Sequence, residues 1–422
     1  MPRLVVKSLP GVALLSAGLC AALVVGAESE TVRVSRSGRG AYEASLAAHP
    51  RGFAVAWHDT RHGLPEIYAR LLDGSGRPVS EEYRLTAGAG RSYEPSIDVP
   101  DPDVSDDLVV AWYEVAADDS SSRARVGAWT AAGTPRWTRT LSDPRRRGRA
   151  AAVAVVGDRI QCVWIEETPR LPGSGGVGRK ETGNRAADTE REFSTVVRAQ
   201  QLGLDGEPLG VAHDIAAASR TTWNLNLSLD DEGVPWLVFD AQLETRAHEL
   251  FLARLGRDPA AVEQLSLDDG APSVYPDLAF GAGRAAVTWW DTRDGNAEVY
   301  LAVVDGQELP RGIESAASRV TDTAGESIGA YVDWNGSRFG LAWSDEVEPG
   351  LPHDVFFQRY AASGVPDGGP RRLTDNPKAS LIPAIRGAGS QFALAWNEDV
   401  VDARGDHRGG GRSEVVFAFA PE

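Results

Sequence analysis

Two Tyr–Glu pairs are the parts of this sequence whose residue types could most directly do chemistry. Tyr42-Glu43 and Tyr93-Glu94 stand 51 residues apart. A tyrosine activated by a neighbouring glutamate, with a further carboxylic acid and an arginine that holds the substrate, can cleave a glycosidic bond. Arg61 and Arg293 are the candidates for that arginine. The alternative, which we favour, is structural: an aromatic side chain fills space beside a solvated carboxylate.

A second chemical possibility is a cation site in one turn of the chain. Asp291, Asp294 and Asn296 carry oxygen donors around a glycine turn. Oxygen ligands suit calcium, but their spacing departs from that of a known calcium loop. His58 and His62 flank another turn and lack a third ligand at a metal-binding spacing. We therefore expect no cofactor, and calcium at Asp291–Asn296 is the one weak metal candidate.

A repeated aromatic–acid motif organises the whole chain. A short apolar run ends in a large aromatic residue, and an acidic residue stands two positions later. Six copies carry Trp57, Trp112, Trp164, Trp289, Trp343 and Trp396, and a degenerate seventh carries Phe239. These aromatic residues lie 50 to 55 residues apart, except for one step of 75. A fixed period of this length is typical of solenoids, propellers and arrays.

Because the acidic residue returns in each repeat, we interpret it as structural. A carboxylate at a strand end can accept backbone N–H groups of the following turn. It can also pair with an arginine of the same turn, as Arg61 and Arg293 would allow.

Each repeat predicts four short strands. The run Phe53–Trp57 is apolar and bounded by turn residues, which indicates a buried strand. Glu66-Ile67-Tyr68 begins the next strand, and a glycine turn leads to a short one at Arg84-Leu85-Thr86. The following unit starts near Pro95-Ser96-Ile97. Four short antiparallel strands make one propeller blade, which must pack against neighbours on both faces.

The two ends of the chain predict how the ring closes. The last repeat stops after its third strand, residues 414–419, and Val32-Arg33-Val34-Ser35 fits the missing fourth strand. Pairing the two hides sheet edges that could otherwise aggregate. The sequence thus predicts an all-β fold: a seven-bladed β-propeller of four-stranded antiparallel blades, closed by the N-terminal strand.

One face of such a propeller collects the functional candidates. The turns between second and third strands share this face with the connections into the next first strand. The candidate binding residues near the central channel are Tyr42, Glu43, Tyr93, Glu94, Trp223, Asn224, Tyr275 and Tyr331. A shallow funnel with aromatic and carboxylate groups is the default binding site of such a face.

The N-terminus predicts export. Arg3 and Lys7 precede or flank an apolar stretch over 9–25, and Val25-Gly26-Ala27 is a plausible cleavage site. We expect a signal peptide over 1–27 and one domain over 28–422, periplasmic or extracellular, with no membrane insertion after cleavage. Lipidation at Cys20 is disfavoured because Leu19 precedes it.

Composition limits the classes of partner that we expect for this protein. The net charge of −17 disfavours nucleic acid and anionic membranes. Cys162 would be the one cysteine left after cleavage, so we expect a small buried thiol and no disulfide.

The insertion over 169–192 is rich in Gly, Arg and Glu without an apolar period, which predicts a disordered surface loop. We expect a monomer.

Two segments resemble a known repeat. Arg371–Pro377 and Asp291–Tyr300 are similar to the WD-like repeats of TolB-type periplasmic propellers. An additional Thr292 interrupts the family's Asp-Arg pair, and the separate N-terminal α/β domain of TolB itself is missing. The resemblance implies a bacterial, exported propeller whose relatives mostly bind proteins.

Two functions follow as expectations. The first is a non-enzymatic binding module that takes a protein or glycan on its loop-rich face. The second is a glycoside hydrolase of the type found in sialidase propellers, although the Ser-x-Asp-x-Gly-x-Thr-Trp box of that family is absent. The arginines discriminate between them: a catalytic site needs them converging with a carboxylate pair on one sugar ring.

Overall fold

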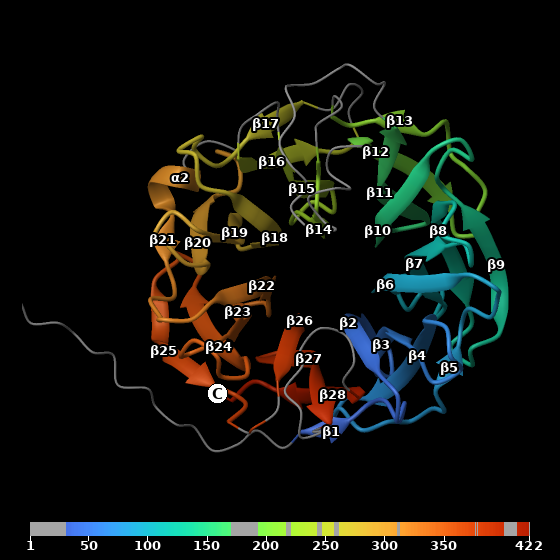
Figure 1. The fold of residues 1–422 in the computed structure, drawn as a ribbon, viewed down its shortest axis with the longest axis horizontal. Coiled ribbons are helices and arrows are strands. Elements are labelled where there is room, and N and C mark those ends of the chain that lie inside the picture. The colour runs from blue at the N-terminus through green and yellow to red at the C-terminus, as the bar shows by residue number, and fades with distance from the viewer. Residues whose placement is uncertain are drawn as a thin grey trace, which may run out of the picture.

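The computed structural model is a ring of seven four-stranded antiparallel sheets around a central channel (Figure 1). It describes residues 31–169, 193–216, 221–242, 247–256, 261–309, 313–375, 377, 379–400 and 412–421. This architecture confirms the predicted seven-bladed propeller. The one described helix, α2 (Ile313–Ala316), is a single turn between the third and fourth strands of the fifth blade.

The first three blades follow the predicted order from the channel outward. Blade 1 contains β2 (Ala41–His49), β3 (Gly52–Asp59), β4 (Glu66–Asp73) and β5 (Tyr83–Arg84). Blade 2 contains β6 (Arg91–Asp98), β7 (Leu108–Val115), β8 (Ser122–Trp129) and β9 (Pro135–Thr140). Blade 3 contains β10 (Arg147–Val156), β11 (Arg159–Pro169), β12 (Phe193–Gly203) and β13 (His213–Asp214).

The next three blades repeat the pattern. Blade 4 contains β14 (Leu225–Leu229), β15 (Pro235–Gln242), β16 (His248–Arg254) and β17 (Val262–Gln264). Blade 5 contains β18 (Ser273–Gly281), β19 (Arg284–Asp291), β20 (Glu298–Asp305) and β21 (Ser318–Arg319). Blade 6 contains β22 (Ser327–Trp334), β23 (Arg338–Asp345), β24 (Asp354–Ala361) and β25 (Pro366–Arg372).

Blade 7 combines both ends of the chain, as predicted. It contains β26 (Ser380–Ala388), β27 (Gln391–Val400), β28 (Arg412–Phe419) and the N-terminal strand β1 (Val32–Arg33). β1 pairs antiparallel with β28, Val32 opposite Phe417. The hydroxyl of Ser35 donates to Glu414 Oε2 at 2.5 Å and accepts the Val415 N–H at 2.8 Å. The ring is therefore closed by two backbone strands and a buried side-chain contact.

The same pair of contacts is made in blades 5 and 6 by the threonine of an Arg-x-Thr motif that recurs at the fourth strands, at Arg84-Leu85-Thr86, Arg319-Val320-Thr321 and Arg372-Leu373-Thr374. In blade 5, Thr321 donates to Glu298 at 2.5 Å and accepts the Val299 N–H at 2.9 Å. Arg319 then pairs with Glu298 at 2.8 Å. The fourth strand of a blade is short, so side-chain bonds to the acid that begins the third strand supplement its ladder.

The core lies between blades rather than within one. Trp57, Phe53 and Leu46 of blade 1 pack with Phe417 and Val415 of blade 7. The motif tryptophans are almost fully buried in such interfaces. Burying a side chain of this size contributes several kcal/mol, which is why each blade needs its neighbours.

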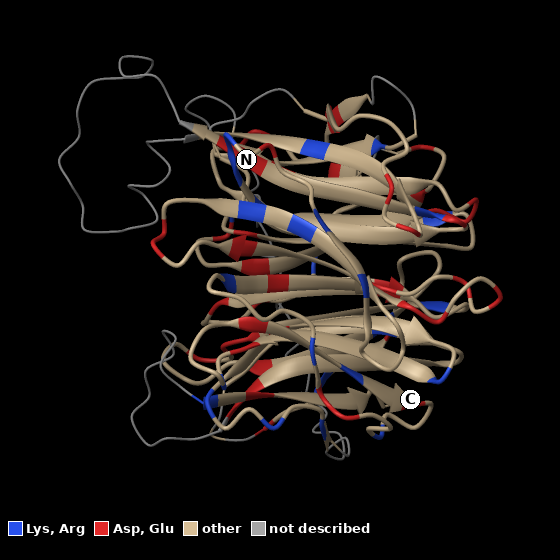
Figure 2. Ribbon diagram, turned by 90° about the vertical axis from the view of Figure 1, so that its right-hand side faces the viewer, with Lys and Arg blue, Asp and Glu red and all other residues tan. Residues whose placement is uncertain are grey.

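The remaining predictions on chain organisation fall partly outside this structure. The signal peptide 1–27 with Cys20 and nearly all of the insertion 169–192 lie outside the described residues. No helix of the described chain is long and apolar enough to cross a membrane. Cys162 is buried, as expected. Figure 2 shows acidic residues (red) in loops on both faces of the ring.

Candidate functional site

A β-bulge interrupts the first strand of six blades at the same place. The register slips between Tyr42 and Ser45 in blade 1 and between Tyr93 and Ser96 in blade 2. The second residue of each bulge has a positive φ of 46° to 61°, and these residues are Glu43, Glu94, Ala150, Tyr275, Gly329 and Ile382. Five of the six are not glycine. A left-handed conformation costs such residues free energy, and bulges of this kind often aim side chains at functional sites.

The bulges surround a cavity of about 610 Å³ that opens along the central channel. The first strands of all seven blades line it, and we call it the funnel. We call the face of the second-to-third-strand turns, where the funnel begins, the top face. Of the predicted face residues, the funnel is lined by Glu43, Glu94, Trp223, Asn224, Tyr275 and Tyr331. Tyr42 and Tyr93 lie behind this lining, against a histidine.

Blades 1 and 2 form an acidic and aromatic wall. His58 Nδ1 lies 3.1 Å from Glu43 Oε2. The imidazole ring is held between Tyr42, at 5.5 Å between centroids, and Tyr93, at 5.3 Å edge to face. Tyr93 stacks in turn on Tyr113 at 5.5 Å. The Tyr–Glu pairs therefore do converge, through His58, which the sequence analysis had considered only as a metal ligand.

Glu94 is the carboxylate with the most unusual surroundings. The funnel walls enclose it, while water still reaches it from the channel. Loss of hydration and the nearby charge of Glu43 raise the pKa of Glu94 to about 8, against a smaller opposing effect of Arg149. A cation bound beside Glu94 would favour the ionised form of that carboxyl.

Blades 4 and 5 form a second aromatic wall across the funnel. Trp223 stacks on His248 at 3.9 Å between centroids and lies 6.5 Å from Tyr275. Tyr275 stacks on Trp290 at 5.8 Å and keeps 39% of its surface exposed. The exposed fraction leaves an aromatic face available to a ligand.

Asp240, from the degenerate seventh motif, positions that wall. Its carboxylate accepts the N–H of Trp223 at 2.7 Å and the N–H of Tyr275 at 3.1 Å. It also lies 3.2 Å from His248 Nδ1. Asp240 directly follows its aromatic residue, Phe239, and its carboxylate holds both Trp223 and Tyr275 of this wall.

Arg149 is a site residue that the sequence analysis missed. It occupies in blade 3 the position that Tyr42 and Tyr93 hold in blades 1 and 2. Its guanidinium lies 2.5 Å from Glu167 Oε1 and donates to the backbone carbonyls of Thr222 and Trp223. Aligning the blades on their first strands would have singled out this arginine.

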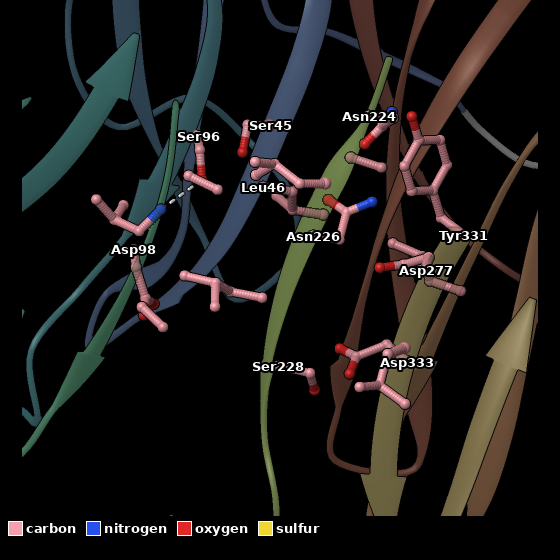
Figure 3. A pocket seen from close by; sticks show the side chains of 18 of the residues that line it. Ser45, Leu46, Ser96, Asp98, Asn224, Asn226, Ser228, Asp277, Tyr331 and Asp333 are labelled. Carbon is pink, nitrogen blue, oxygen red and sulfur yellow. Dashed lines mark hydrogen bonds between the residues drawn. The ribbon is translucent and has the colours of Figure 1, made fainter. Parts of the chain in front are cut away.

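Deeper in the channel, carboxylates join neighbouring blades. Asp98 accepts the Val155 N–H at 2.7 Å, and Asp277 accepts the Val332 N–H at 2.9 Å. Figure 3 shows Asp277 and Tyr331 on one wall with Asp98 across the channel. Burial raises the pKa of Asp277 to about 7, with the bond from Val332 acting in the opposite direction. These acids stabilise inner strands that share no backbone ladder.

The two candidate arginines pair with carboxylates that do not line the funnel. Arg61 pairs with Asp59 at 2.6 Å and with Glu82, and it lies over the ring of Tyr68. Arg293 similarly pairs with Asp291 at 2.7 Å and Glu314 at 2.5 Å. Each of the two guanidinium groups is thus paired with carboxylates of its own blade.

The acid of the repeated motif has the structural role that we expected. Asp59 accepts the indole N–H of Trp57 at 3.1 Å and the Arg61 N–H at 2.8 Å. Glu166 and Asp345 accept from their own tryptophans at 2.9 and 3.1 Å. The motif ties a core indole to the turn that follows it.

The candidate calcium ligands have other partners. Asp291 binds Arg293, Asp294 accepts from the Tyr300 hydroxyl, and Asn296 donates its amide to the carbonyls of Thr323 and Gly325. No group of three or more His, Cys, Asp or Glu within the described ranges is arranged to hold a metal ion.

The chain was compared with known proteins. No protein-family model and no curated protein matches the chain. Similar solved structures include a prolyl endopeptidase (14% identity, TM-score 0.47, covering 90% of this chain and 50% of that one). An ulvan lyase of family PL25 (12%, 0.47, 79% and 80%) and Trypanosoma rangeli sialidase (10%, 0.46, 92% and 59%) are also similar.

These similarities carry no activity over to this chain. The chain spans about half the length of the prolyl endopeptidase. The relation to TolB-type repeats that the sequence suggested is not among these findings.

Proposed function

We propose that this protein is an exported binding module that takes its ligand into the funnel on the top face without transforming it. One observation carries the proposal. Non-glycine residues at positive φ, Glu43, Glu94 and Tyr275 among them, present charged and aromatic side chains around an open cavity of about 610 Å³. Strain of this kind persists where the surrounding structure holds it for a purpose, and the volume suits a ligand of drug size or larger.

The ion pairs of the candidate arginines favour binding over glycoside cleavage. Arg61 and Arg293 are held by their own carboxylates, and Arg149 is held by Glu167. An anionic sugar would meet the acidic wall of Glu43 and Glu94 at the mouth before it reached Arg386, which lines the funnel near Asp98 and Asp277. The repulsion disfavours the substrates that the clamp was meant to hold.

Glycoside hydrolysis remains a second candidate because of one observation. Glu94, with its raised pKa, lies on the same wall of the funnel as Glu43. A carboxyl group with a raised pKa can act as the general acid in glycoside hydrolysis, which uses a pair of carboxyl groups. The candidate applies to neutral sugars, since no arginine of the candidate clamp is free.

Arrays of defined peptides and glycans test the proposal directly. The wild-type protein is compared with Tyr275→Ala in the funnel and with Val365→Ala, an exposed apolar residue in a turn between third and fourth strands. Hits that disappear in Tyr275→Ala and persist in Val365→Ala support the funnel as the binding site. Hits that both variants keep would overturn it.

A fluorogenic glycoside panel decides between the two candidates. We expect no turnover above background with the wild-type protein. Turnover that Glu94→Gln reduces by about a hundredfold or more, the usual contribution of a general acid, would replace the binding proposal with the hydrolase.

A further inference from the structure

The mouth of the funnel carries two carboxyl groups that lack a cationic partner among the described residues, apart from His58 beside Glu43. Glu94 makes no hydrogen bond or ion pair with any residue in the described part of the chain. Glu43 faces only His58 at ion-pair distance there. The nearest arginine, Arg149, is engaged by Glu167 and two backbone carbonyls. The described protein therefore supplies no free cation to these two carboxylates.

Aromatic rings flank the same space. The face of Tyr275 is exposed, and Trp223 lines the funnel beside it. Tyr and Trp faces attract ammonium and guanidinium groups within about 6 Å of the ring centroid. Carboxylates on one wall and aromatic faces on the other form the combination that recognises an organic cation, whereas a neutral sugar would use only the aromatic wall.

The ring of bulges also leaves room for a chain to enter. Ala150 of blade 3 and Gly329 of blade 6 occupy the bulge position with little or no side chain. Glu43 and Glu94 project from adjacent blades, while Tyr275 and Ile382 project from the others. The mouth is thus acidic at blades 1 and 2 and apolar at blades 5 and 7. Ala150 leaves a gap next to Glu94, and Gly329 leaves one between Tyr275 and Ile382.

We infer that the funnel takes a lysine or arginine side chain of a polypeptide partner, with its cation against Glu94 and Glu43 and its stem along the aromatic wall. This inference rests on the proposed function and names its ligand class. A polypeptide fits better than a small free amine because the cavity of about 610 Å³ has room for several residues. The long apolar stems of Lys and Arg suit a mouth that is apolar at blades 5 and 7.

Isothermal titration with short defined probes tests the inference. The probes are capped tetralysine, spermidine as a free polyamine, and maltotetraose as a neutral glycan. The variants are Glu94→Gln, Tyr275→Ala and the control Asp103→Asn. Asp103 is an exposed acid in the loop between β6 and β7, on the face opposite the funnel mouth. The control removes the same formal charge, and thermal melts confirm that each variant is folded.

We expect tetralysine to bind the wild type and to lose about tenfold in affinity in Glu94→Gln, because a charge-assisted contact is removed. Tyr275→Ala should lose about fivefold through the missing cation–π contact. Asp103→Asn should stay within about twofold, the effect of one distant surface charge screened by salt.

Other results would overturn the inference in distinguishable ways. Equal losses in Glu94→Gln and Asp103→Asn would show only general attraction to an acidic protein. Spermidine that binds as tightly as tetralysine, with the same dependence on Glu94, would identify a free polyamine instead. Maltotetraose binding that needs Tyr275 but not Glu94 would refute the inference of a cationic ligand and leave the funnel as a binding site. If no probe binds, the inference of a cationic ligand is refuted, while the arrays would still decide the proposed function.

Discussion

Replacing Ser35 by alanine should loosen the closure of the ring. The Ser35 hydroxyl donates to Glu414 at 2.5 Å and accepts the buried Val415 N–H at 2.8 Å. Glu414 keeps two other donors, the N–H groups of Ser37 and Gly38, each at 2.9 Å. Alanine leaves the Val415 N–H without a side-chain acceptor in a position closed to water.

The magnitude follows from these two bonds. A hydrogen bond to a charged group contributes about 1.5–3 kcal/mol, and an unsatisfied buried N–H costs about 1–3 kcal/mol. Because Glu414 retains donors, we expect Ser35→Ala to lower the free energy of unfolding by about 2–4 kcal/mol. The loss should appear in urea unfolding followed by tryptophan fluorescence.

Thr374→Ala is the matched control. Thr374 makes the same pair of bonds in blade 6, to Asp354 at 2.8 Å and from the Val355 N–H at 2.9 Å. Both variants should lose similar global stability, but only Ser35→Ala should speed hydrogen exchange of the Val34 amide, which bonds Val415. A loss below about 0.5 kcal/mol in Ser35→Ala, the range of ordinary surface substitutions, would refute the reasoning.

Three further predictions concern the core, a turn and the funnel. Trp57→Phe should cost about 2 kcal/mol more than Trp112→Phe in unfolding experiments, because the first indole donates to a carboxylate and the second has no hydrogen-bond partner among the described residues. Gly76→Ala should destabilise by at least about 1 kcal/mol, whereas Gly74→Ala should be near neutral. The first position has φ +79° and a Cβ there would lie 2.2 Å from a phenylalanine ring, while the second has open space. Wild-type Tm should fall as pH rises from about 4.3, the unfolded pKa of glutamate, to the folded pKa of Glu94 of about 8. The folded chain keeps a proton that the unfolded chain releases in this window, so stability is present below it and lost above. Glu94→Gln should flatten that fall; equal slopes would contradict the raised pKa.

Much of the fold was predictable because each repeat carries a large aromatic residue that the core requires. Trp57 and its counterparts had to be buried between sheets, so the number of aromatic repeats predicted the number of blades. Val32–Ser35 could be assigned to the last blade because Ser35 matches the threonine of the Arg-x-Thr motif.

The site was predictable only in part. Glu43, Glu94 and Tyr275 were selected, but not the bulges that aim them, because non-glycine residues at positive φ have no sequence signature as strong as glycine's. Arg61 and Arg293 pair with the aspartate two residues before them, which is the structural alternative that the sequence analysis had given beside the clamp. Arg149 and His58 act through contacts between strands, which spacing along the chain does not reveal.

The most direct test of the account is a crystal structure of the protein with capped tetralysine. The account predicts a lysine ammonium group within hydrogen-bond distance of Glu94 or Glu43, with its stem against Tyr275 or Trp223. A peptide bound on the outer strands or the opposite face, with only water in the funnel, would contradict it.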